Sequence, residues 1–416
     1  MRILFVVNEI PYPPDNGVRI VSHNVMRLMH EAGHELALAV LTCEAENNEE
    51  RFKKAAEFCN DGMAWWMQLP QRSGWATLLN AMAGRRLFFI ERYRSPLFRE
   101  KLRSLVEVFE PDVIHFDLIP MTQYRDIAPG GIGTVASIND CYALVLKNAL
   151  ENESYTGFEY FYRRLQYVQT CRYEAGVYPK FDVTHVMSGV DEEYLHFLNP
   201  SIRTAVIPNG VDQSLFGIVD QTRGKTDLIF VAKLEDDNLL SLEAFLKQAW
   251  PIIHKECPEV KFHIVGKIGA QAQNTHRRFA DMDGVIFHGY VDQVKDAYSQ
   301  CGIAIVPVNK NCGIINKAIE AMAAGLVTVG FKKAFTALVQ AKQEKDFISA
   351  ERYNEIGCAV VNVIRNRPLR EAIQRSAGEL AAKYYSWSGR VGLYESMYQT
   401  SFGKQKRLAQ VVGKES

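Results

Sequence analysis

The stretch Asn311-Cys-Gly-Ile-Ile-Asn-Lys-Ala-Ile-Glu-Ala-Met-Ala-Ala-Gly325 lies between two short apolar runs, at 303–306 and 327–329. Runs of this length on either side of a helix-period segment predict a strand, a helix and a strand. A helix that joins two strands in this way is typical of a parallel sheet covered by helices. The stretch therefore favours an α/β fold.

The same stretch places its side chains and backbone for a particular kind of ligand. Lys317 and Glu320 are three residues apart and share one face of the predicted helix. A helix start directs free N–H groups at an anion, so Gly313 and Ile314 are suited to a diphosphate. The lysine can then reach phosphate, and the carboxylate can accept hydrogen bonds from both hydroxyls of a ribose. An ordinary core helix capped by Gly325 fits the same residues, and this alternative stays open.

Strand-like runs alternate with helix-period segments along the whole chain, which predicts two doubly wound, Rossmann-like domains. We expect an N-terminal domain over 1–204, a C-terminal domain over 205–385, and a C-terminal helix and tail over 386–416 that pack back on the first domain. In such folds the ligand lies beyond the carboxyl ends of the strands, here in a cleft that the two domains face. The predicted strands are 3–7, 36–41, 113–116, 134–138, 183–187, 228–232, 262–265, 285–287, 303–306 and 327–329.

The composition excludes several classes of protein. The 416 residues carry 48 basic and 48 acidic side chains, so the charge gives no support for nucleic-acid binding. The eight cysteines are scattered without a C-x-x-C pair, and free thiols in a reducing cytosol fit best. The first apolar run is too short for a signal peptide, and nothing approaches the roughly 20 apolar residues of a membrane-spanning helix. We expect a cytoplasmic protein, with peripheral contact to the inner face of a membrane left open.

Several ligand motifs are absent from the sequence. No Gly-x-Gly-x-x-Gly follows a predicted strand, which weakens the case for a nicotinamide or flavin enzyme. Gly224-Lys225-Thr226 resembles the end of a Walker A loop, but Val219 stands where that loop needs its first glycine. No cysteines and histidines have zinc spacing, and we expect no metal site.

A series of motifs instead runs through the chain in a fixed order: Pro13 to Gly17 with Arg19, Val206-Ile-Pro-Asn-Gly-Val-Asp212 with Phe216, Phe230-Val-Ala-Lys233, Ile264-Val-Gly266, His288-Gly-Tyr-Val291, and the helix at 313–325. In these motifs the chain resembles glycosyltransferase family 4, whose members are retaining enzymes of the GT-B fold. It also resembles the subgroup with a Gly-Ile-x-Asn-Lys-x-x-Glu donor helix. The resemblance is strongest over 206–330 and weak over 44–110.

The resemblance implies a donor-binding site in the C-terminal domain. Glu320 matches the glutamate that holds the donor ribose, and Gly313 and Ile314 would hold the distal phosphate. The first glutamate of the family's spaced pair is absent, because Cys312 stands eight residues before Glu320. The residues that would lie near the base are Gly266, Tyr290 and Val291.

The resemblance also implies cations beside the diphosphate. Lys233 follows the first strand of the C-terminal domain, where a cation would stabilise the leaving phosphate without a metal. An exposed lysine at a strand end is the alternative. The family's second basic residue is replaced by an acidic run at 235–237 and Asn238, so electrostatic support for the leaving group would be thinner or would come from Lys317 or Arg19. No cofactor is expected beyond the donor itself, a UDP- or GDP-sugar.

Asn16 and Gly17 end the first loop of the N-terminal domain. Gly17 lets the backbone approach a diphosphate and an acceptor closely, because it has no Cβ. Asn16 stands where the family commonly has another glycine, and asparagine tolerates left-handed backbone. A simple turn from strand to helix is the alternative.

Asn139 and Asp140 follow the strand at 134–138, where many members of the family carry a histidine that faces the donor sugar. Asn139 can hydrogen-bond a sugar hydroxyl without titrating. Asp140 is suited to serve as acceptor base or substrate ligand, and equally to cap the helix that begins near residue 142. His115 and Asp117, at the end of another strand, are further candidates of this kind.

Aromatic residues gather in two places that bear on the acceptor. A tyrosine-rich helical stretch, 142–178, fits either an acceptor groove or core packing. Trp65, Trp66 and Trp75, with arginines at 85, 86, 92 and 94, fit either a seat for a lipid-linked acceptor or a solvated helix.

Together these observations predict a retaining, hexosyltransferase-like enzyme that moves a sugar from a nucleotide-diphosphate sugar to a hydroxyl of a glycan, lipid-linked or small-molecule acceptor. No enzymic nucleophile is evident, so the resemblance implies front-face attack assisted by the leaving phosphate. Polysaccharide or glycoconjugate biosynthesis is the pathway that the resemblance suggests. Cys312 and Asn139 also fit a catalytically silent binder of sugar nucleotides or an assembly partner, and a sugar-nucleotide epimerase is the third alternative.

Overall fold

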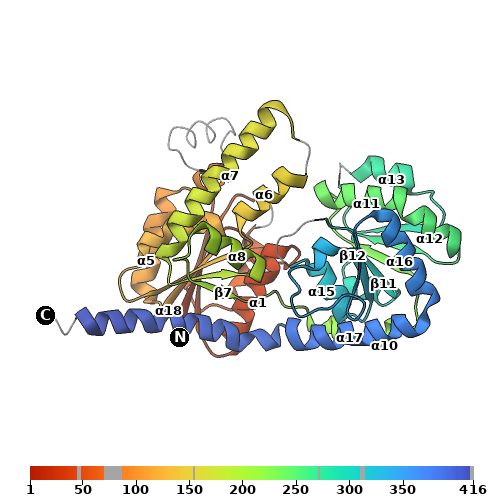
Figure 1. Ribbon diagram of the computed structural model, residues 1–416. Coiled ribbons are helices and arrows are strands. Elements are labelled where there is room, and N and C mark those ends of the chain that lie inside the picture. The colour runs from red at the N-terminus through yellow and green to blue at the C-terminus, as the bar shows by residue number, and fades with distance from the viewer. Residues whose placement is uncertain (45–47, 70–86, 153–154, 270–271, 310–313, 413–416) are drawn as a thin grey trace. The chain divides into compact units, whose positions relative to one another are not determined.

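The computed structural model describes the chain apart from residues 45–47, 70–86, 153–154, 270–271, 310–313 and 413–416. The chain divides into two compact units (Figure 1). Unit 1 comprises Met1–Pro208 and Arg390–Ser416, and unit 2 comprises Asn209–Gly389.

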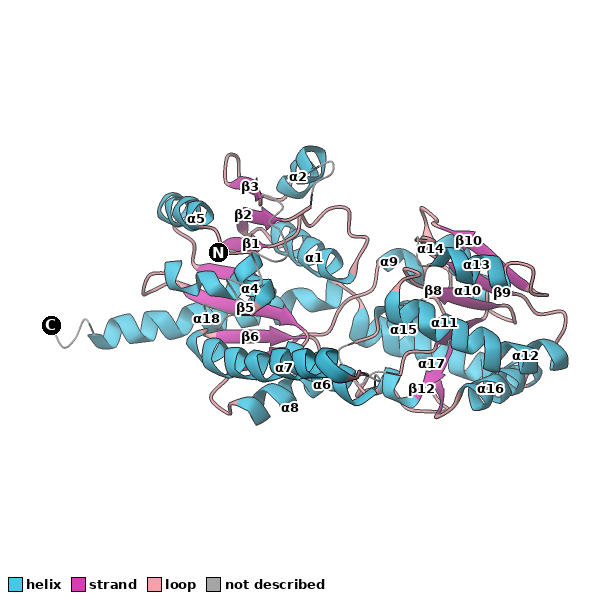
Figure 2. Cartoon of the chain, turned by 90° about the horizontal axis from the view of Figure 1, so that it is seen from above, coloured by secondary structure: helices cyan, strands magenta, loops and turns pink. Residues whose placement is uncertain are grey.

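Within the described residues, unit 1 is built on a seven-stranded sheet in the order β3-β2-β1-β4-β5-β6-β7 (Figure 2). All neighbouring strands are parallel. β1 lies between β2 and β4, and it is buried over almost its whole length, as an apolar run with no alternation predicts. The strand order reverses between β1 and β4, which makes the space beyond their carboxyl ends the switch point of this sheet. The strands are β1 Arg2–Val7, β2 Glu35–Thr42, β3 Ala64–Gln68, β4 Val113–Asp117, β5 Gly133–Asn139, β6 Val183–Val186 and β7 Thr204–Val206.

Local sequence signals set the helices that pack on this sheet. At the start of α1 the Asn16 side chain accepts a hydrogen bond from the Arg19 N–H, and Gly33 follows the helix with a φ of 81°. Val21, Val25 and Leu28 form its buried stripe. The described helices of unit 1 are α1 Gly17–Glu31, α2 Asn48–Ala56, α4 Phe88–Arg92, α5 Pro96–Phe109, α6 Tyr142–Asn152, α7 Gly157–Val177, α8 Gly189–Leu198 and α18 Val391–Val412, with short 3-10 segments η1 Ile119–Ile127 and η2 Tyr178–Lys180. A further 3-10 segment, η5 Ser388–Arg390, spans the boundary from unit 2 to unit 1.

The C-terminal helix α18 belongs to unit 1 and packs against β4, β5 and β6. Its Tyr394 and Tyr398 are fully buried, and the Tyr398 hydroxyl forms a 2.9 Å hydrogen bond with His115 Nδ1. The approach is close enough that a Cβ on Gly133 would lie 2.9 Å from the Phe402 nitrogen. The last helix is therefore part of the core of the first unit.

Unit 2 is built on a sheet of six parallel strands among the residues described, in the order β10-β9-β8-β11-β12-β13. Its order reverses between β8 and β11, and this is the second switch point. The strands are β8 Leu228–Val231, β9 Phe262–Val265, β10 Val285–Gly289, β11 Ile303–Val306, β12 Val327–Phe331 and β13 Ile348–Ala350. The helices are α9 Gln213–Phe216, α10 Val219–Thr222, α11 Asp236–Gln248, α12 Trp250–Glu256, α13 Gln273–Phe279, α14 Val294–Tyr298, α15 Asn316–Ala323, α16 Tyr353–Arg365 and α17 Arg367–Tyr385, with η4 Lys332–Phe335.

The α/β prediction is confirmed, and the differences have local causes. Three strands, β3, β7 and β13, are missing from the prediction. They lie at sheet edges or are only three residues long, so their apolar signal is weak. The boundary predicted after residue 204 falls inside β7, which pairs with β6, and the chain leaves unit 1 after Pro208. The predicted helical stretch 142–178 is two helices, α6 and α7, because the chain takes extended and left-handed backbone at Thr156 and Gly157.

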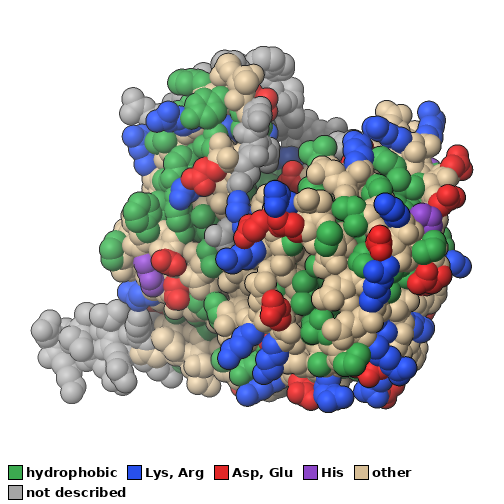
Figure 3. Space-filling model, turned by 45° about the vertical axis from the view of Figure 1, so that its right-hand side comes forward, with side chains coloured by type: hydrophobic (Ala, Val, Ile, Leu, Met, Phe, Trp, Pro, Cys, Tyr) green, Lys and Arg blue, Asp and Glu red, His purple; other side chains and the backbone are tan. Residues whose placement is uncertain are grey.

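Two surface properties bear on partners. None of the described helices combines the length and the apolar character needed to cross a membrane. Basic and acidic side chains are interspersed on the face shown in Figure 3, in keeping with equal numbers of the two in the sequence.

Candidate active site

The start of α15 lies beside the switch point of unit 2, between β11 and β12 in the chain. The helix begins at Asn316, and Asn209 from the predicted inter-domain turn donates a 2.6 Å hydrogen bond to Asn316 Oδ1. The first helical turn is therefore formed by residues from Asn316 onward. The predicted phosphate ligand Ile314 precedes this turn and is half-buried against the core. The other two predicted ligands, Cys312 and Gly313, lie outside the described residues.

Glu320 stands on α15 with its carboxylate held inside unit 2. The hydroxyl of Tyr298, at the end of α14, donates to Glu320 Oε2 over 3.4 Å. Burial raises the pKa of Glu320, while the Tyr298 hydrogen bond and the Lys317 charge oppose the rise and Asp212 adds to it. A buried carboxylate with a single protein donor keeps acceptor capacity for a ligand.

Lys317 lies one helical turn before Glu320, as the spacing predicted. Its ammonium donates to Asn238 Oδ1 of α11 over 2.8 Å and stands 5.0 Å from the centre of the Phe230 ring of β8. Burial lowers the pKa of Lys317 to about 8, and Glu320 partly opposes that shift. The structure therefore places a cation and a carboxylate side by side on one helix at the switch point.

Lys233 follows β8 and is largely exposed. Its ammonium pairs with Glu235 Oε2 at 2.7 Å, and the Lys233 side chain is 67% exposed. This is the exposed lysine of the alternative interpretation, with its charge partly compensated. Its contact with a diphosphate stays a prediction.

Gly266, Tyr290 and Val291 follow β9 and β10 at the same edge of the sheet. Gly266 has a φ of 148°, and a Cβ there would lie 1.8 Å from the Ala232 carbonyl oxygen, so the position admits no larger residue without movement. Tyr290 is 68% exposed, whereas Val291 is half-buried against the core. Tyr290 is thus free to meet a ligand, and Val291 is held in place.

At the switch point of unit 1, Asn16 and Gly17 begin α1. Asn16 caps the helix with a φ of −138°, so its tolerance of left-handed backbone is not used. Arg19 is paired with three carboxylates, Glu9 at 3.2 Å, Asp15 at 2.6 Å, and Glu44. In this arrangement the strand-to-helix turn accounts for Asn16, and the Arg19 charge is already balanced by the protein.

Asn139 and Asp140 lie at the carboxyl end of β5. The backbone turns at Asn139 with a φ of 62°, and the Asp140 N–H donates to the Ile138 carbonyl at 2.8 Å. Asn139 is buried, and its Oδ1 has no hydrogen-bond partner in the described part of the chain. Burial raises the pKa of Asp140 to about 7, and the charge of Asp191 acts in the same direction.

The start of α6 is capped by a residue from another helix, not by Asp140. The N–H groups of Tyr142 and Ala143 donate to the carboxylate of Glu174 on α7, at 2.9 and 3.1 Å. The Cys141 N–H donates to Asp191 Oδ1 at 2.9 Å. The capping alternative for Asp140 is therefore wrong, because Glu174 and Asp191 already accept these hydrogen bonds.

The two remaining candidates of unit 1, His115 and Asp117, differ in their surroundings. His115 is inside the core with Tyr398, and burial lowers its pKa to about 3, so it is neutral and structural. Asp117 is buried at the carboxyl end of β4, where the Ser22 hydroxyl of α1 donates to its Oδ2. Its Oδ1 has no partner among the described residues, and burial raises its pKa to about 7.

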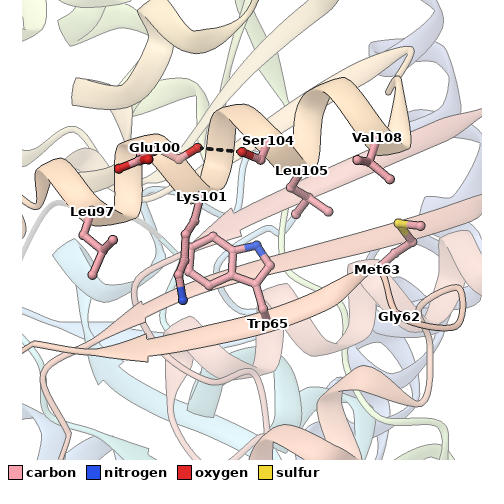
Figure 4. Close-up of a pocket in the computed structure, with 9 residues that line it drawn as sticks. All are labelled: Gly62, Met63, Trp65, Leu97, Glu100, Lys101, Ser104, Leu105 and Val108. Atoms are coloured by element: carbon pink, nitrogen blue, oxygen red, sulfur yellow. Dashed lines mark hydrogen bonds between the residues drawn. The ribbon is translucent and has the colours of Figure 1, made fainter.

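A pocket of about 430 Å³ lies elsewhere in unit 1, between β3 and α5 (Figure 4). Trp65 forms its floor, with its ring 5.0 Å from Phe98 and the Lys101 ammonium 5.7 Å from its centre. Among the lining residues, Trp65 belongs to the predicted seat for a lipid-linked acceptor, and none belongs to the predicted donor site. Of the other residues in that aromatic prediction, Trp75 and the arginines at 85 and 86 lie outside the described residues.

Sequence reasoning missed the residues that hold the candidate groups in place. Tyr298, Asn238 and Glu174 are each distant in sequence from the group that they contact, and a single tyrosine, asparagine or glutamate carries no motif. Within the described residues, histidine, cysteine and carboxylate side chains form no group of three or more suited to a metal ion.

Two family models match consecutive parts of the chain. Residues 15–215 match the family model described as Glycosyltransferase Family 4, and residues 225–366 match the model described as Glycosyl transferases group 1. No curated protein matches the chain.

Solved structures share the fold over almost the entire chain. Sucrose-phosphate synthase from Thermosynechococcus elongatus matches with a TM-score of 0.72 at 14% identity, covering 97% of this chain and 100% of that one. HepE from Anabaena, in complex with UDP and glucose, matches with a TM-score of 0.62 at 14% identity, covering 96% and 99%. The pneumococcal O-GlcNAc transferase GtfA, in complex with UDP and GlcNAc, matches with a TM-score of 0.62 at 11% identity, covering 96% and 98%. These likenesses assign the GT-B fold.

Proposed function

Since this chain is a glycosyltransferase of the GT-B type, we propose that it moves a sugar from a nucleotide-diphosphate sugar to an acceptor hydroxyl with retention of anomeric configuration. The donor is a UDP- or GDP-sugar. The UDP bound in the structures of HepE and GtfA favours a UDP-sugar over a GDP-sugar. The acceptor is a glycan, a lipid-linked sugar or a small molecule. Polysaccharide or glycoconjugate assembly in the cytoplasm, at the inner face of a membrane, is part of the same proposal.

One observation carries the proposal: Lys317 and Glu320 stand one turn apart on α15, both half-buried, and each keeps hydrogen-bonding capacity among the described residues. A carboxylate is the side chain that accepts from two adjacent hydroxyls of a ribose. An ammonium is a compact cation for a phosphate oxygen. Their separation along one helix suits the distance between the ribose and the diphosphate of one nucleotide.

The other residues of unit 2 complete the donor site in this proposal. Lys233 exchanges its ion pair with Glu235 for the leaving phosphate, which is feasible because both side chains reach solvent. The base stacks near Tyr290 and Val291, beyond the Gly266 turn. Cys312, Gly313 and Ile314 meet the distal phosphate and sugar through their backbone.

In unit 1, Asn139 and Asp140 are assigned to the sugar and the acceptor. The unpartnered Asn139 Oδ1 accepts from a sugar hydroxyl, and the Asp140 carboxylate accepts from the acceptor hydroxyl and orients it. The bond between the anomeric carbon and the phosphate oxygen breaks, and the acceptor oxygen bonds to that carbon from the same face. The acceptor proton passes to the leaving phosphate oxygen, so no cofactor or protein nucleophile is required. Asn16, Gly17 and Arg19 line the donor diphosphate after Arg19 leaves its carboxylate partners.

The test is binding and turnover of UDP-, GDP-, ADP- and dTDP-sugars by the full chain. Thermal shift identifies the donor, and Glu320→Ala should abolish that shift, whereas Glu379→Ala, an exposed change on α17, should not. Slow hydrolysis of the same donor to nucleoside diphosphate and free sugar can be monitored by nuclear magnetic resonance. The sugar that is released first should have the same anomeric configuration as in the donor.

The outcomes separate the alternatives. A donor that binds through Glu320 and is neither hydrolysed nor transferred to any of a panel of acceptors would favour the silent sugar-nucleotide binder or assembly partner. Conversion of the donor to its epimer would favour the epimerase. No shift with any donor would overturn the proposal.

A further inference from the structure

We propose that Asn238 is a positioning residue that holds the Lys317 ammonium charged and aimed at a phosphate group of a diphosphate ligand. This inference rests on the proposed function, because it names the part of the donor that Lys317 takes. It gives a role to Asn238 of α11, which lies in the stretch where the family's second basic residue is absent.

The geometry around Lys317 is that of a cation without a matching anion. Its ammonium has three N–H donors, and within the described residues one of them is used, on the neutral amide oxygen of Asn238 at 2.8 Å. The Phe230 ring faces the ammonium at 5.0 Å and offers only its π-face. The carboxylate on the same helix, Glu320, already accepts from Tyr298.

The charged groups on the neighbouring elements leave Lys317 with little compensation. Burial lowers the pKa of Lys317, and the charge of Glu320 on α15 opposes that fall. Between β8 and α11, Glu235 is paired with Lys233 at 2.7 Å. β8 contributes the Phe230 ring, which carries no charge. Two N–H groups of this half-buried ammonium meet no acceptor among the described residues, and an anion would satisfy them. A phosphate group is the anion that the proposed function brings to this edge of the sheet.

Asn238 also sets how much of the ammonium is charged. An amide oxygen accepts a hydrogen bond from an ammonium but offers nothing comparable to a neutral amine's lone pair, so it favours the protonated form. Burial pulls the pKa of Lys317 down to about 8, and removal of the amide would let it fall further. An aspartate in the same place would raise it, because a carboxylate attracts the ammonium directly.

The test follows the Lys317 titration in the full chain labelled with 13Cε-lysine, with Lys317→Arg to identify its signal. Asn238→Leu and Asn238→Asp are close in size to the native side chain, and Gln248→Leu on the exposed end of α11 is the matched control. We expect the pKa of Lys317 to fall in Asn238→Leu, to rise in Asn238→Asp and to stay unchanged in Gln248→Leu. A pKa that is the same in all four proteins would overturn the inference.

The second readout is the pH dependence of binding of inorganic pyrophosphate, which carries neither nucleoside nor sugar. Its alkaline limb should follow the Lys317 pKa, so one pH unit between variants corresponds to roughly tenfold in affinity on that limb. Asn238→Asp should bind more weakly at every pH but hold its affinity to higher pH. The inference would be overturned if pyrophosphate did not bind. It would also be overturned if the alkaline limb stayed at the same pH when the Lys317 pKa changed between variants. Limbs that move as expected while no nucleotide sugar binds would support the inference and contradict the proposed function.

Discussion

The Tyr298 hydroxyl lies 3.4 Å from Glu320 Oε2 and donates a hydrogen bond to it within unit 2. Burial holds the pKa of Tyr298 well above its ordinary value, so the phenol stays protonated and remains a donor. The carboxylate that we assign to the ribose is therefore oriented before any ligand arrives.

Tyr298→Phe should weaken donor binding about tenfold, since a hydrogen bond to a charged group is worth roughly 1.5 kcal/mol. The loss should appear in Kd, measured by calorimetry with the donor found above, and leave the melting temperature nearly unchanged. Tyr353→Phe is the matched control, because Tyr353 packs on Phe331 in the same unit, away from Glu320. Equal donor affinity in the two variants would argue against this role for Tyr298.

The pH profile of transfer should carry an acid limb near pH 7. The pKa of Asp140 is raised to about 7, and its ionised form is the one that orients the acceptor. kcat/KM should therefore rise as pH increases through about 7. Asp140→Asn should lose this limb and about tenfold in rate, the scale of a hydrogen bond to a charged group. A limb that persists in Asp140→Asn would assign it to another group.

Removal of the Glu174 carboxylate should destabilise unit 1. Glu174→Ala leaves the N–H groups of Tyr142 and Ala143 without their acceptor, which should cost about 3 kcal/mol for two lost hydrogen bonds to a buried carboxylate. Urea denaturation followed by circular dichroism measures the change. Glu174→Gln should lose less, because it keeps one acceptor oxygen.

Glu174 should also make the stability depend on pH. Its folded pKa, about 7, lies above its ordinary value of 4.5, so its contribution is fully present below about pH 4.5 and is lost as pH rises through about 7. The stability difference between wild type and Glu174→Gln should therefore shrink over that range. A difference that grows with pH would show that the carboxylate is ionised in the folded protein.

Gly266→Ala should disrupt unit 2 by more than 2 kcal/mol, the scale of a backbone clash at a constrained position. The new Cβ would lie 1.8 Å from the Ala232 carbonyl, and the φ of 148° is unfavourable for alanine. Gly217→Ala is the control, because its Cβ would lie 3.5 Å from the Ser214 carbonyl. Thermal denaturation of the two variants compares them, and similar melting temperatures would contradict the expectation.

The sequence predicts the parallel strands well because buried strands are continuous apolar runs. β1 and β11 coincide with their predicted runs to within one residue. The edge strand β3 is missing from the prediction, and its residues are half-buried up to the exposed Gln68. The break between α6 and α7 is missing from the prediction, because a change of backbone at Thr156 and Gly157 leaves little trace in hydrophobic periodicity.

For the site, the sequence predicts residues that lie together on one helix. It misses residues that contact that helix from other helices. The adjacency of Lys317 and Glu320 follows from helix geometry alone. Asn238 and Tyr298 meet them only after α11 and α14 pack beside α15, and no local pattern encodes that meeting. Asp140 shows a different error. Its position just before a helix favours a capping role, but Glu174, which is distant in sequence on α7, accepts the hydrogen bonds from the start of α6.

The return of α18 to unit 1 has a consequence for the order in which the protein is made. Unit 2 is one continuous segment, so a ribosome delivers it complete before residues 390–412 emerge. Until then β4, β5 and β6 lack the helix that buries Tyr394 and Tyr398 against them. The half of the protein that is translated first is therefore the half that finishes folding last, and its uncovered sheet is the surface that a chaperone would meet on the nascent chain.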